Sequence, residues 1–369
     1  MNLRNMNYNK KLLFLVGWLL MPGIFHAQNI TEKRTIDKSF KASPHTSVDI
    51  TNKYGKIHVM TWNQDSVRVK VIITYRAPNQ SKLAKIKSNV DFEIIGTPGY
   101  VTAKSVFGNN YRGFLSEIVD MTENIFSSEK NMEIDYEVTL PEYLNLSIDN
   151  KYGNVYINNH TGNFNLSLSY GDFKANNLGG NVNLDIRFGD GVINSINTGR
   201  ISLLYSNFSL DQANNITITS KSSELRIEAI NILKTDSRRD KYYITELNSF
   251  YGKSTFSDIS IRKIFNDVNY TPKYGSISME WVSKVFSLIN FNSKYTDISM
   301  FFEKDAGYNV DISYKNAELS YPESLARLNR KPDPDDDKSY ILYGSIGTVR
   351  TSSKLRIDAE FGNIKLFHK

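Results

Sequence analysis

Two aspartates recur in the same short sequence context, and this recurrence is the strongest sign of chemistry in the chain. Asp172 lies in "SYGDF" and Asp190 in "RFGDG", each two residues after an aromatic residue, and Glu224 has the same position after Ser222. If neighbouring strands about 4.8 Å apart carried Asp172 and Asp190 in register, their two carboxylates would approach the separation that retaining glycosidases use. Asp and Asn side chains also bond their own backbone at tight turns. We favour the turn interpretation and keep Asp172, Asp190 and Glu224 as candidate ligand-binding residues.

The rest of the catalytic inventory is thin. The five histidines are isolated along the sequence and the chain has no cysteine, so neither a histidine cluster nor a Cys-ligated metal site is expected. No Gly-x-Ser-x-Gly elbow, phosphate-binding loop or dinucleotide glycine pattern occurs. We therefore expect no enzymatic activity, no catalytic residue, no cofactor and no metal.

Two charged segments are predicted to be solvated loops. The segment 321–340 contains Asp333, Asp335, Asp336 and Asp337, but it lacks the turn Gly and the distal Glu of an EF-hand Ca²⁺ loop. The segment "DSRRDKYY" at 236–243 flanks two arginines with aspartates. The first segment is expected to be mobile, and cation binding by it is left open.

An internal repeat indicates which elements position these residues. Tyr or Phe followed by Gly, Ser or another small residue recurs at positions 152, 170, 188 and 205, and Ser stands at the next expected position, 222. A fixed period of about 20 residues is typical of stacked repeats. The later steps from 222 to 251 and from 314 to 343 are much longer than these. The predicted corners are Tyr54, Tyr152, Tyr170, Phe188, Tyr205, Ser222, Tyr251, Tyr274, Tyr295, Tyr314, Tyr343 and Phe361.

Each repeat is predicted to form two short strands. Apolar residues stand three and five positions after a corner, as at Val155 and Ile157, and they alternate with polar residues before it, as at Leu166 and Leu168. A period of two indicates half-buried strands, and turn glycines such as Gly162 are expected to supply positive φ. A unit of about 18 residues is too short for helical crossovers, so the predicted fold is an all-β, right-handed parallel β-solenoid, or β-helix. A sandwich or a propeller would not explain columns in register at this period.

The sequence predicts three regions. Residues 1–27 have the order of a secretory signal peptide, with basic residues before an apolar run at 12–25, and an uncleaved anchor is the alternative. Residues 28–148 are expected to form the first coil plus capping insertions, with short helices at 79–90 and 113–126 near the N-terminal end. Residues 149–369 are expected to form the β-solenoid repeats with a loop insertion at 321–340. The helices are expected to cover the open end of the array, and membrane-surface or partner binding is their other possible role.

The charge balance bears on partners and location. The chain has 45 basic and 39 acidic residues, a net charge of +6, and loss of residues 1–27 would leave +3. A balance this even argues against a nucleic-acid partner. No segment after the signal is apolar enough to span a membrane. The expected location is therefore the periplasm, the outer surface or the extracellular medium.

The repeated sequences "NKYGKIHV", "NKYGNVYI", "SYGDFKA" and "EFGNIKL" resemble the bacterial putative-adhesin family, whose members are exported β-solenoid domains common in Bacteroidetes. The resemblance covers about residues 30–369. It implies a β-solenoid fold and an adhesive role, and it brings no catalytic residues. Gly is missing after the corner at Ser206, Ser223, Thr296 and Lys315, so the motif defines the register of those coils less well.

The column of corner aromatics has two possible roles. Rings stacked one coil apart would stiffen the array. Rings that faced solvent would form a platform for sugars or for another envelope surface. The expected function is that of a non-enzymatic exported surface or envelope protein that acts in adhesion or scaffolding through a repetitive face, with a glycan or another envelope protein as its partner. The alternative is a polysaccharide lyase or hydrolase on a β-helix, by analogy of fold.

Overall fold

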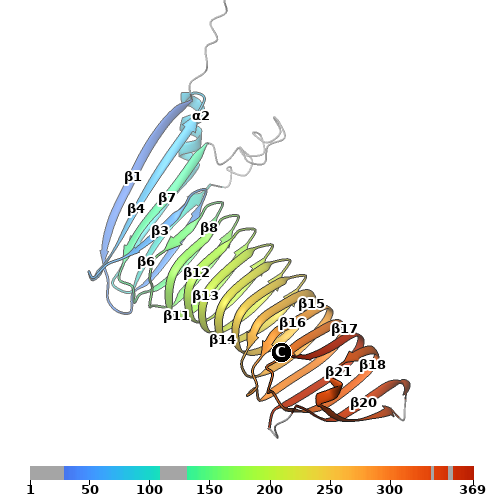
Figure 1. The fold of residues 1–369 in the computed structure, drawn as a ribbon. Coiled ribbons are helices and arrows are strands. Elements are labelled where there is room, and N and C mark those ends of the chain that lie inside the picture. The colour runs from blue at the N-terminus through green and yellow to red at the C-terminus, as the bar shows by residue number, and fades with distance from the viewer. Residues whose placement is uncertain (1–28, 109–130, 334–335, 348–351) are drawn as a thin grey trace, which may run out of the picture.

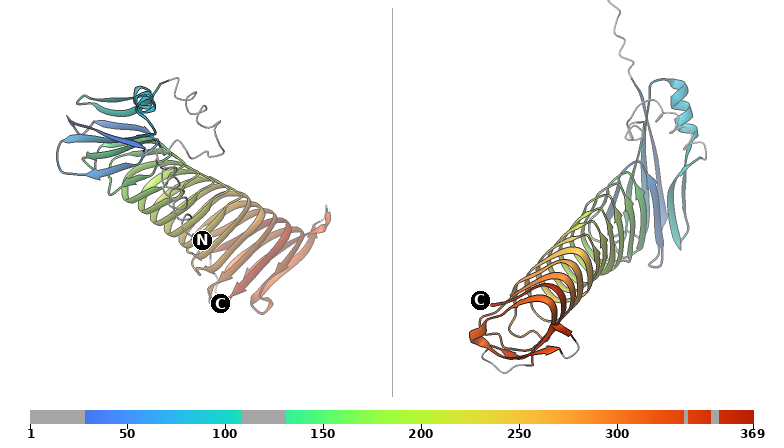
Figure 2. Two further views of the ribbon diagram at one scale, coloured as in Figure 1. Left: turned by 90° about the horizontal axis from the view of Figure 1, so that it is seen from above. Right: turned by 90° about the vertical axis from the view of Figure 1, so that its right-hand side faces the viewer.

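The computed structural model describes residues 29–108, 131–333, 336–347 and 352–369. The expected signal peptide, the expected helix at 113–126 and the side chains of 333–337 lie outside the described part. Within it, the chain is almost entirely β-structure, arranged as a long stack of coils with a broader sheet at the N-terminal end (Figures 1 and 2). The predicted all-β parallel solenoid is confirmed, and the hand of its coil stays a prediction.

The N-terminal part and the first coils are built from short elements. These are β1 (Ile30–Lys41), β2 (Ser47–Lys53), β3 (Ile57–Thr61), β4 (Ser66–Ala77), α2 (Gln80–Ser88), β5 (Val90–Gly96), β6 (Tyr100–Phe107), β7 (Met132–Leu140), β8 (Asn145–Lys151) and β9 (Val155–Ile157). The helix predicted at 79–90 is confirmed as α2. Asn79 caps it by accepting a hydrogen bond from the Lys82 backbone N–H at 2.9 Å, and Leu83 and Ile86 are buried.

Most strands of the array run through a large part of a coil. They are β10 (Phe164–Ser169), β11 (Phe173–Arg187), β12 (Gly191–Leu204), β13 (Asn207–Lys221), β14 (Glu224–Arg238), β15 (Lys241–Ile264), β16 (Val268–Val282), β17 (Leu288–Phe302), β18 (Tyr308–Ser320), β19 (Ala326–Asp333), β20 (Asp336–Ile346) and β21 (Lys354–His368), with the short 3₁₀ helix η1 (Glu323–Leu325) before β19.

Successive coils pair in parallel and in register, which creates continuous columns inside the stack. Leu166 pairs with Leu184, Leu184 with Ile201, and Ile201 with Ile218. All four side chains are buried, whereas the residues between them point outward because side chains alternate along a strand. Burial of these apolar columns therefore drives the stacking of coils.

The two residues of the aromatic-glycine motif have different roles at a corner. Tyr170 itself adopts the left-handed conformation, with φ of 59°, which costs an L-residue roughly 1–2 kcal/mol. Gly171 is needed for close approach instead, since a Cβ there would lie 2.2 Å from the Gly153 carbonyl oxygen. Gly162 likewise has no positive φ, and its Cβ would lie 2.1 Å from the Leu144 oxygen. The expectation that turn glycines supply the positive φ is therefore wrong at these positions.

The long predicted step from Ser222 to Tyr251 contains an additional corner, at Arg239. The left-handed corner residues here are Ser222, Arg239, Phe256 and Tyr274, so the short step between corners continues through this region without a break. The predicted corner at Tyr251 is wrong, because Tyr251 is not left-handed and the corner within β15 is at Phe256. The segment 236–243, predicted to be a solvated loop, is instead the corner between β14 and β15.

The C-terminal end also differs from its predicted form. Tyr314 is not a corner, since the left-handed residue there is Asn316, and Tyr343 in β20 is not left-handed either. Most of 321–340, predicted to be a loop, forms strand, and β20 runs antiparallel to both β18 and β19. Antiparallel strands thus close this end of the parallel stack.

The last strand in the sequence is not the last in space. β21 pairs in parallel with β17 on one side and with β18 on the other, so it lies between two strands that precede it (Figure 1). The N-terminal end shows a similar order, because β2 lies between β6 and β8, and β3 between β7 and β9. Antiparallel β1, β4 and β5 complete that end.

Candidate functional site: the corner ladder

The corner aromatics form two runs of stacked rings, which together are called the corner ladder below. Neighbouring ring centroids are 5.0–5.4 Å apart in the first run and 4.5–5.0 Å apart in the second, with interplanar angles of 15° or less. The first run is Tyr54, Tyr152, Tyr170, Phe188 and Tyr205, and the second is Phe256, Tyr274, Tyr295 and Phe361. The spacing equals one coil because each ring sits at one left-handed corner.

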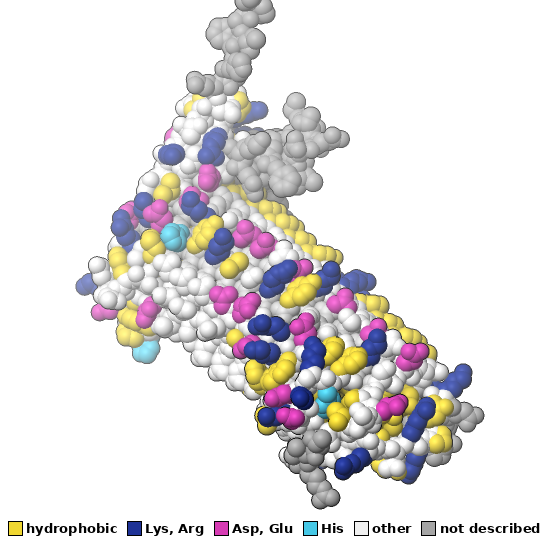
Figure 3. Space-filling model, in the orientation of Figure 1, with side chains coloured by type: hydrophobic (Ala, Val, Ile, Leu, Met, Phe, Trp, Pro, Cys, Tyr) yellow, Lys and Arg dark blue, Asp and Glu magenta, His cyan; other side chains and the backbone are white. Residues whose placement is uncertain are grey.

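Most rings of the corner ladder also face solvent, whereas Tyr54 is buried and Tyr152 and Phe361 are partly exposed. Tyr170, Phe188, Tyr274 and Tyr295 are each more than 40% exposed. Figure 3 shows hydrophobic side chains in a row along one long edge of the stack. Because the ring faces stack on one another, the row offers mainly ring edges and hydroxyl groups to a partner. Both roles predicted for this column, stiffening and an exposed platform, are therefore compatible with the same geometry.

Lysines line the N-terminal part of the corner ladder. The Lys53 ammonium is 4.6 Å from the centroid of Tyr54, and the Lys151 ammonium is 5.1 Å from Tyr152 and 5.7 Å from Tyr170. Each lysine immediately precedes a corner, so the strand that ends there holds it beside the ring. Cations at this distance are attracted to the ring quadrupole, and they add positive charge along this part of the corner ladder.

The ladder is interrupted at two consecutive corners, Ser222 and Arg239. The rings on either side, Tyr205 and Phe256, are 53% and 51% exposed, the largest values in the ladder. The strand positions just before these four corners pair in register, so Tyr205 and Phe256 lie three coil steps apart, roughly 14 Å at about 4.8 Å per step. This interruption is called the ladder gap below.

A buried carboxylate stabilises the corner beneath the ladder gap. Asp240 is 2% exposed and accepts four hydrogen bonds of 2.7–2.9 Å, from the hydroxyls of Ser220 and Ser237 and the backbone N–H groups of Ser223 and Arg238. Its charge is thus satisfied inside the protein. Burial raises the pKa of the adjacent Tyr242 well above its ordinary value. Asp240 takes the position that Gly has in earlier coils.

The candidate carboxylates Asp172 and Asp190 take part in hydrogen bonds between coils. The Asn154 side chain accepts from the Asp172 N–H at 2.8 Å, Asp172 accepts from the Asp190 N–H at 3.1 Å, and Asp190 accepts from the Asn207 side-chain amide at 2.9 Å. Each side chain therefore caps the backbone of the next coil. This geometry matches the turn role that we favoured from the sequence, although the bonds run to the next coil rather than within one turn.

The structure does not bring Glu224 into that chain of hydrogen bonds. Glu224 pairs with Arg226 on its own strand, and its backbone N–H donates to the Ser206 carbonyl at 3.0 Å. Among the described residues no group of three or more His, Cys, Asp or Glu side chains could hold a metal ion. In the same part of the chain, no helix has the length and apolar character required to cross a membrane.

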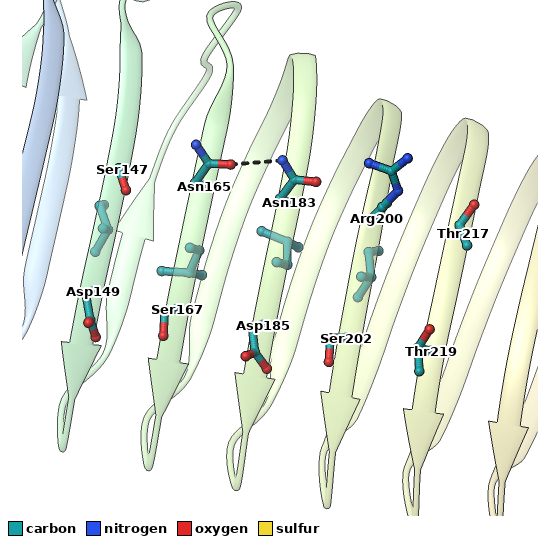
Figure 4. Close-up of a pocket in the computed structure, with 14 residues that line it drawn as sticks. Ser147, Asp149, Asn165, Ser167, Asn183, Asp185, Arg200, Ser202, Thr217 and Thr219 are labelled. Atoms are coloured by element: carbon teal, nitrogen blue, oxygen red, sulfur yellow. Dashed lines mark hydrogen bonds between the residues drawn. The ribbon is translucent and has the colours of Figure 1, made fainter.

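The sheet face that leads to the first run carries two polar rows. Figure 4 shows Asn165, Asn183 and Arg200 in one row and Asp185 and its neighbours in the other. These residues line a shallow depression of about 600 Å³. The Asn183 amide donates to the Asn165 side-chain oxygen at 2.9 Å. The second row lies three residues before the ring of each coil. A ligand on the ladder would therefore meet polar groups on this side.

Sequence reasoning found most of the ladder but missed Phe256 and Arg239. Phe256 is followed by Ser and Arg239 by Asp, so neither carries the aromatic-glycine motif. The missed signal was spacing, because both positions continue the step that leads from Tyr205 to Ser222.

No family model matches the chain, and no curated protein matches it. Among solved structures, the chain is similar to a "putative cell adhesion protein" from Clostridium sporogenes, at 10% identity over 92% of this chain and all of the other, with a TM-score of 0.20. It is also similar to a "putative adhesin" from Bacteroides fragilis, at 10% identity over 91% of this chain and 98% of the other, with a TM-score of 0.26. Both names agree with the family that the sequence resembles. At these TM-scores, the function proposed below is based on the geometry of the chain itself.

Proposed function

We propose that this protein is a non-enzymatic, exported surface or envelope protein that acts in adhesion or scaffolding through its corner ladder. The observation that carries the proposal is the exposure of rings at a fixed spacing of 4.5–5.4 Å along one edge. A rigid, repeating ridge of ring edges, hydroxyls and lysines suits a repeating partner, such as a glycan or another envelope protein. The periplasm, the outer surface or the extracellular medium is the proposed location.

The non-enzymatic part of the proposal is supported by the carboxylate geometry. Asp172 and Asp190 are engaged by backbone N–H groups of the next coil, which is what a structural role requires. A glycosidase would need two carboxyl groups free to face one sugar. Release of reducing ends from a glycan by the parent protein, lost in Asp172→Asn, would overturn this part of the proposal.

The adhesive part can be tested with beads that carry the full chain. Retention under flow would be measured on surfaces coated with dextran, with alginate or with albumin. The test variant combines Tyr170→Asn and Tyr295→Asn, which removes one ring from each run. Asn adopts the same corner conformation at Asn316, with φ of 47°, so the fold should tolerate it. We expect at least a tenfold loss of retention on any surface that holds the parent.

The matched control is Tyr100→Thr, since Tyr100 is 44% exposed but lies on β6, away from the ladder. Retention by this control should equal that of the parent. Equal retention by the ladder variant and the parent, or retention by neither on all three surfaces, would reject adhesion through the corner ladder.

A further inference from the structure

The ladder gap leaves room for a ring over Ser222. Ser222 occupies a left-handed corner, with φ of 54°, where the preceding coils place a ring. Within the run the face of Phe188 is covered by Tyr205 at 5.4 Å, but no ring or cation among the described residues covers the opposite face of Tyr205. A flat or chair-shaped ring placed over Ser222 would stack on that face at the spacing of the ladder.

The ladder gap is also rich in unpaired positive charge. Lys221, Arg238 and Arg239 are exposed at or just before its two corners, and within the described residues none of their side chains has an ion pair or a side-chain hydrogen bond. Figure 3 shows Lys and Arg side chains where the hydrophobic row along the edge is interrupted.

The neighbouring acids are already committed to other partners. Glu224 pairs with Arg226, and Asp236 with Lys253 at 3.1 Å, while Asp240 is buried with four hydrogen-bond donors. The three cations of the gap are therefore left to attract an anion, and the two arginines can bind a planar carboxylate or a sulfate with paired N–H groups.

We propose that the ladder gap binds one pyranose ring of an acidic polysaccharide, stacked on Tyr205 over Ser222, with its anionic group bound by Arg238, Arg239 and Lys221. This proposal rests on the proposed adhesive function and names the class of glycan. A single-stranded nucleic acid would need a series of free ring faces for successive bases. The ladder offers free faces only at the ends of its runs, which favours a single sugar ring at this position.

The decisive variant fills the gap without changing charge. Ser222→Tyr should place a stacked ring in the gap, because Tyr adopts this corner conformation at Tyr205 and Tyr170. Binding of the full chain to alginate (a polyuronate), dextran sulfate, neutral dextran and oligo-dT would be measured at near-physiological salt in EDTA. We expect the parent to bind alginate or dextran sulfate at least tenfold more tightly than dextran, and Ser222→Tyr to lose at least tenfold of that affinity.

A second variant tests the charge separately. Arg238→Gln combined with Arg239→Gln should lose at least tenfold in affinity for the anionic polymer, and the fold should tolerate it because both side chains are exposed. The control Lys174→Gln removes an exposed cation from β11, on the strand that follows the Tyr170 corner and away from the ladder gap, and should bind like the parent. The comparison of alginate with dextran sulfate tells a carboxylate from a sulfate ligand, and preference for either supports the proposal.

Several results would overturn this assignment. Ser222→Tyr binding as tightly as the parent, equal affinity for dextran, tighter binding of oligo-dT than of both anionic polysaccharides, or no binding of either anionic polymer would each reject the gap as the site. If the beads still adhere through the ladder while the gap variants have no effect, the proposed function stands and only this inference fails.

Discussion

His160 is a buried histidine in a position that the neighbouring coils fill with apolar residues. It is 0% exposed, pairs across the stack with Leu178, and neither ring nitrogen has a hydrogen-bond partner among the described residues. Burial lowers the pKa of His160 to about 4, and the nearby backbone of Asn163 and Leu144 offsets part of this lowering. The neutral imidazole is therefore the folded form.

The pKa of His160 predicts a specific loss of stability in acid. Between about pH 6.5 and 4, the unfolded chain binds a proton that the folded chain does not, so the free energy of unfolding falls by up to about 3 kcal/mol over this window. His160→Leu, which copies Leu178, should remove this part of the pH dependence. Urea unfolding of both proteins at pH 7, 6, 5 and 4.5 measures it. A difference between them that stays constant with pH would contradict the prediction.

Single residues also show how far the sequence could predict the corners. Where a ring precedes Gly, as at Tyr170 and Gly171, two physical demands meet at one place and the motif is unmistakable. At Arg239 only the backbone conformation is kept, and a buried Asp240 replaces the glycine by satisfying hydrogen bonds inside the protein. Such a corner has no local signature, so only the regular spacing of the corners could reveal it.

The order of strands in space was the part of the fold that could not be predicted from the sequence. β21 has the same alternation as any other strand of the array, and its buried Leu355 and Ile357 fit the same columns as Ile289 and Phe291 of β17. Its local pattern would be satisfied beside any coil. The antiparallel β19 and β20 were obscured by their charge, since outer strands can carry many solvated side chains.

The inserted position of β21 predicts that the C-terminal coils depend on the final residues of the chain. A chain that ends at Ser353 would leave β17 and β18 each with an unpaired edge and exposed apolar columns. We expect this truncated protein to aggregate at concentrations where the parent is monodisperse by light scattering.

A synthetic peptide of residues 352–369, added during refolding, should restore solubility by pairing with both edges. The same peptide with Ile357→Asp and Ile364→Asp is the control, because both residues are buried in the parent. A truncated chain that stays monodisperse without peptide would show that β17 and β18 do not need the insertion.

At the scale of the whole molecule, the ends are built to stop the array from growing. The outermost strand β1 carries ion pairs from Asp37 to Arg68 at 2.6 Å and from Glu32 to Lys87 at 2.6 Å. Such exposed pairs contribute little stability, but charge on an edge strand disfavours pairing with another copy. With both ends closed by antiparallel strands, the proposed binding surface lies along the side of the stack.

The continuous core predicts that the array unfolds as one unit. Ile157 is 3% exposed and lies in a buried cluster that extends from β2 to β21. Ile157→Asp would bury an unpaired charge, which costs several kcal/mol. Because each coil is stabilised chiefly by its neighbours, we expect the loss at β9 to lower protection from hydrogen exchange in β16 and β17 as well as in the adjacent β3 and β11.

Asn159→Asp, at an exposed turn position two residues later, should leave protection near the parent level. Exchange measured by mass spectrometry separates the outcomes, since loss confined to the strands around β9, with β16 and β17 fully protected, would mean that the coils unfold independently.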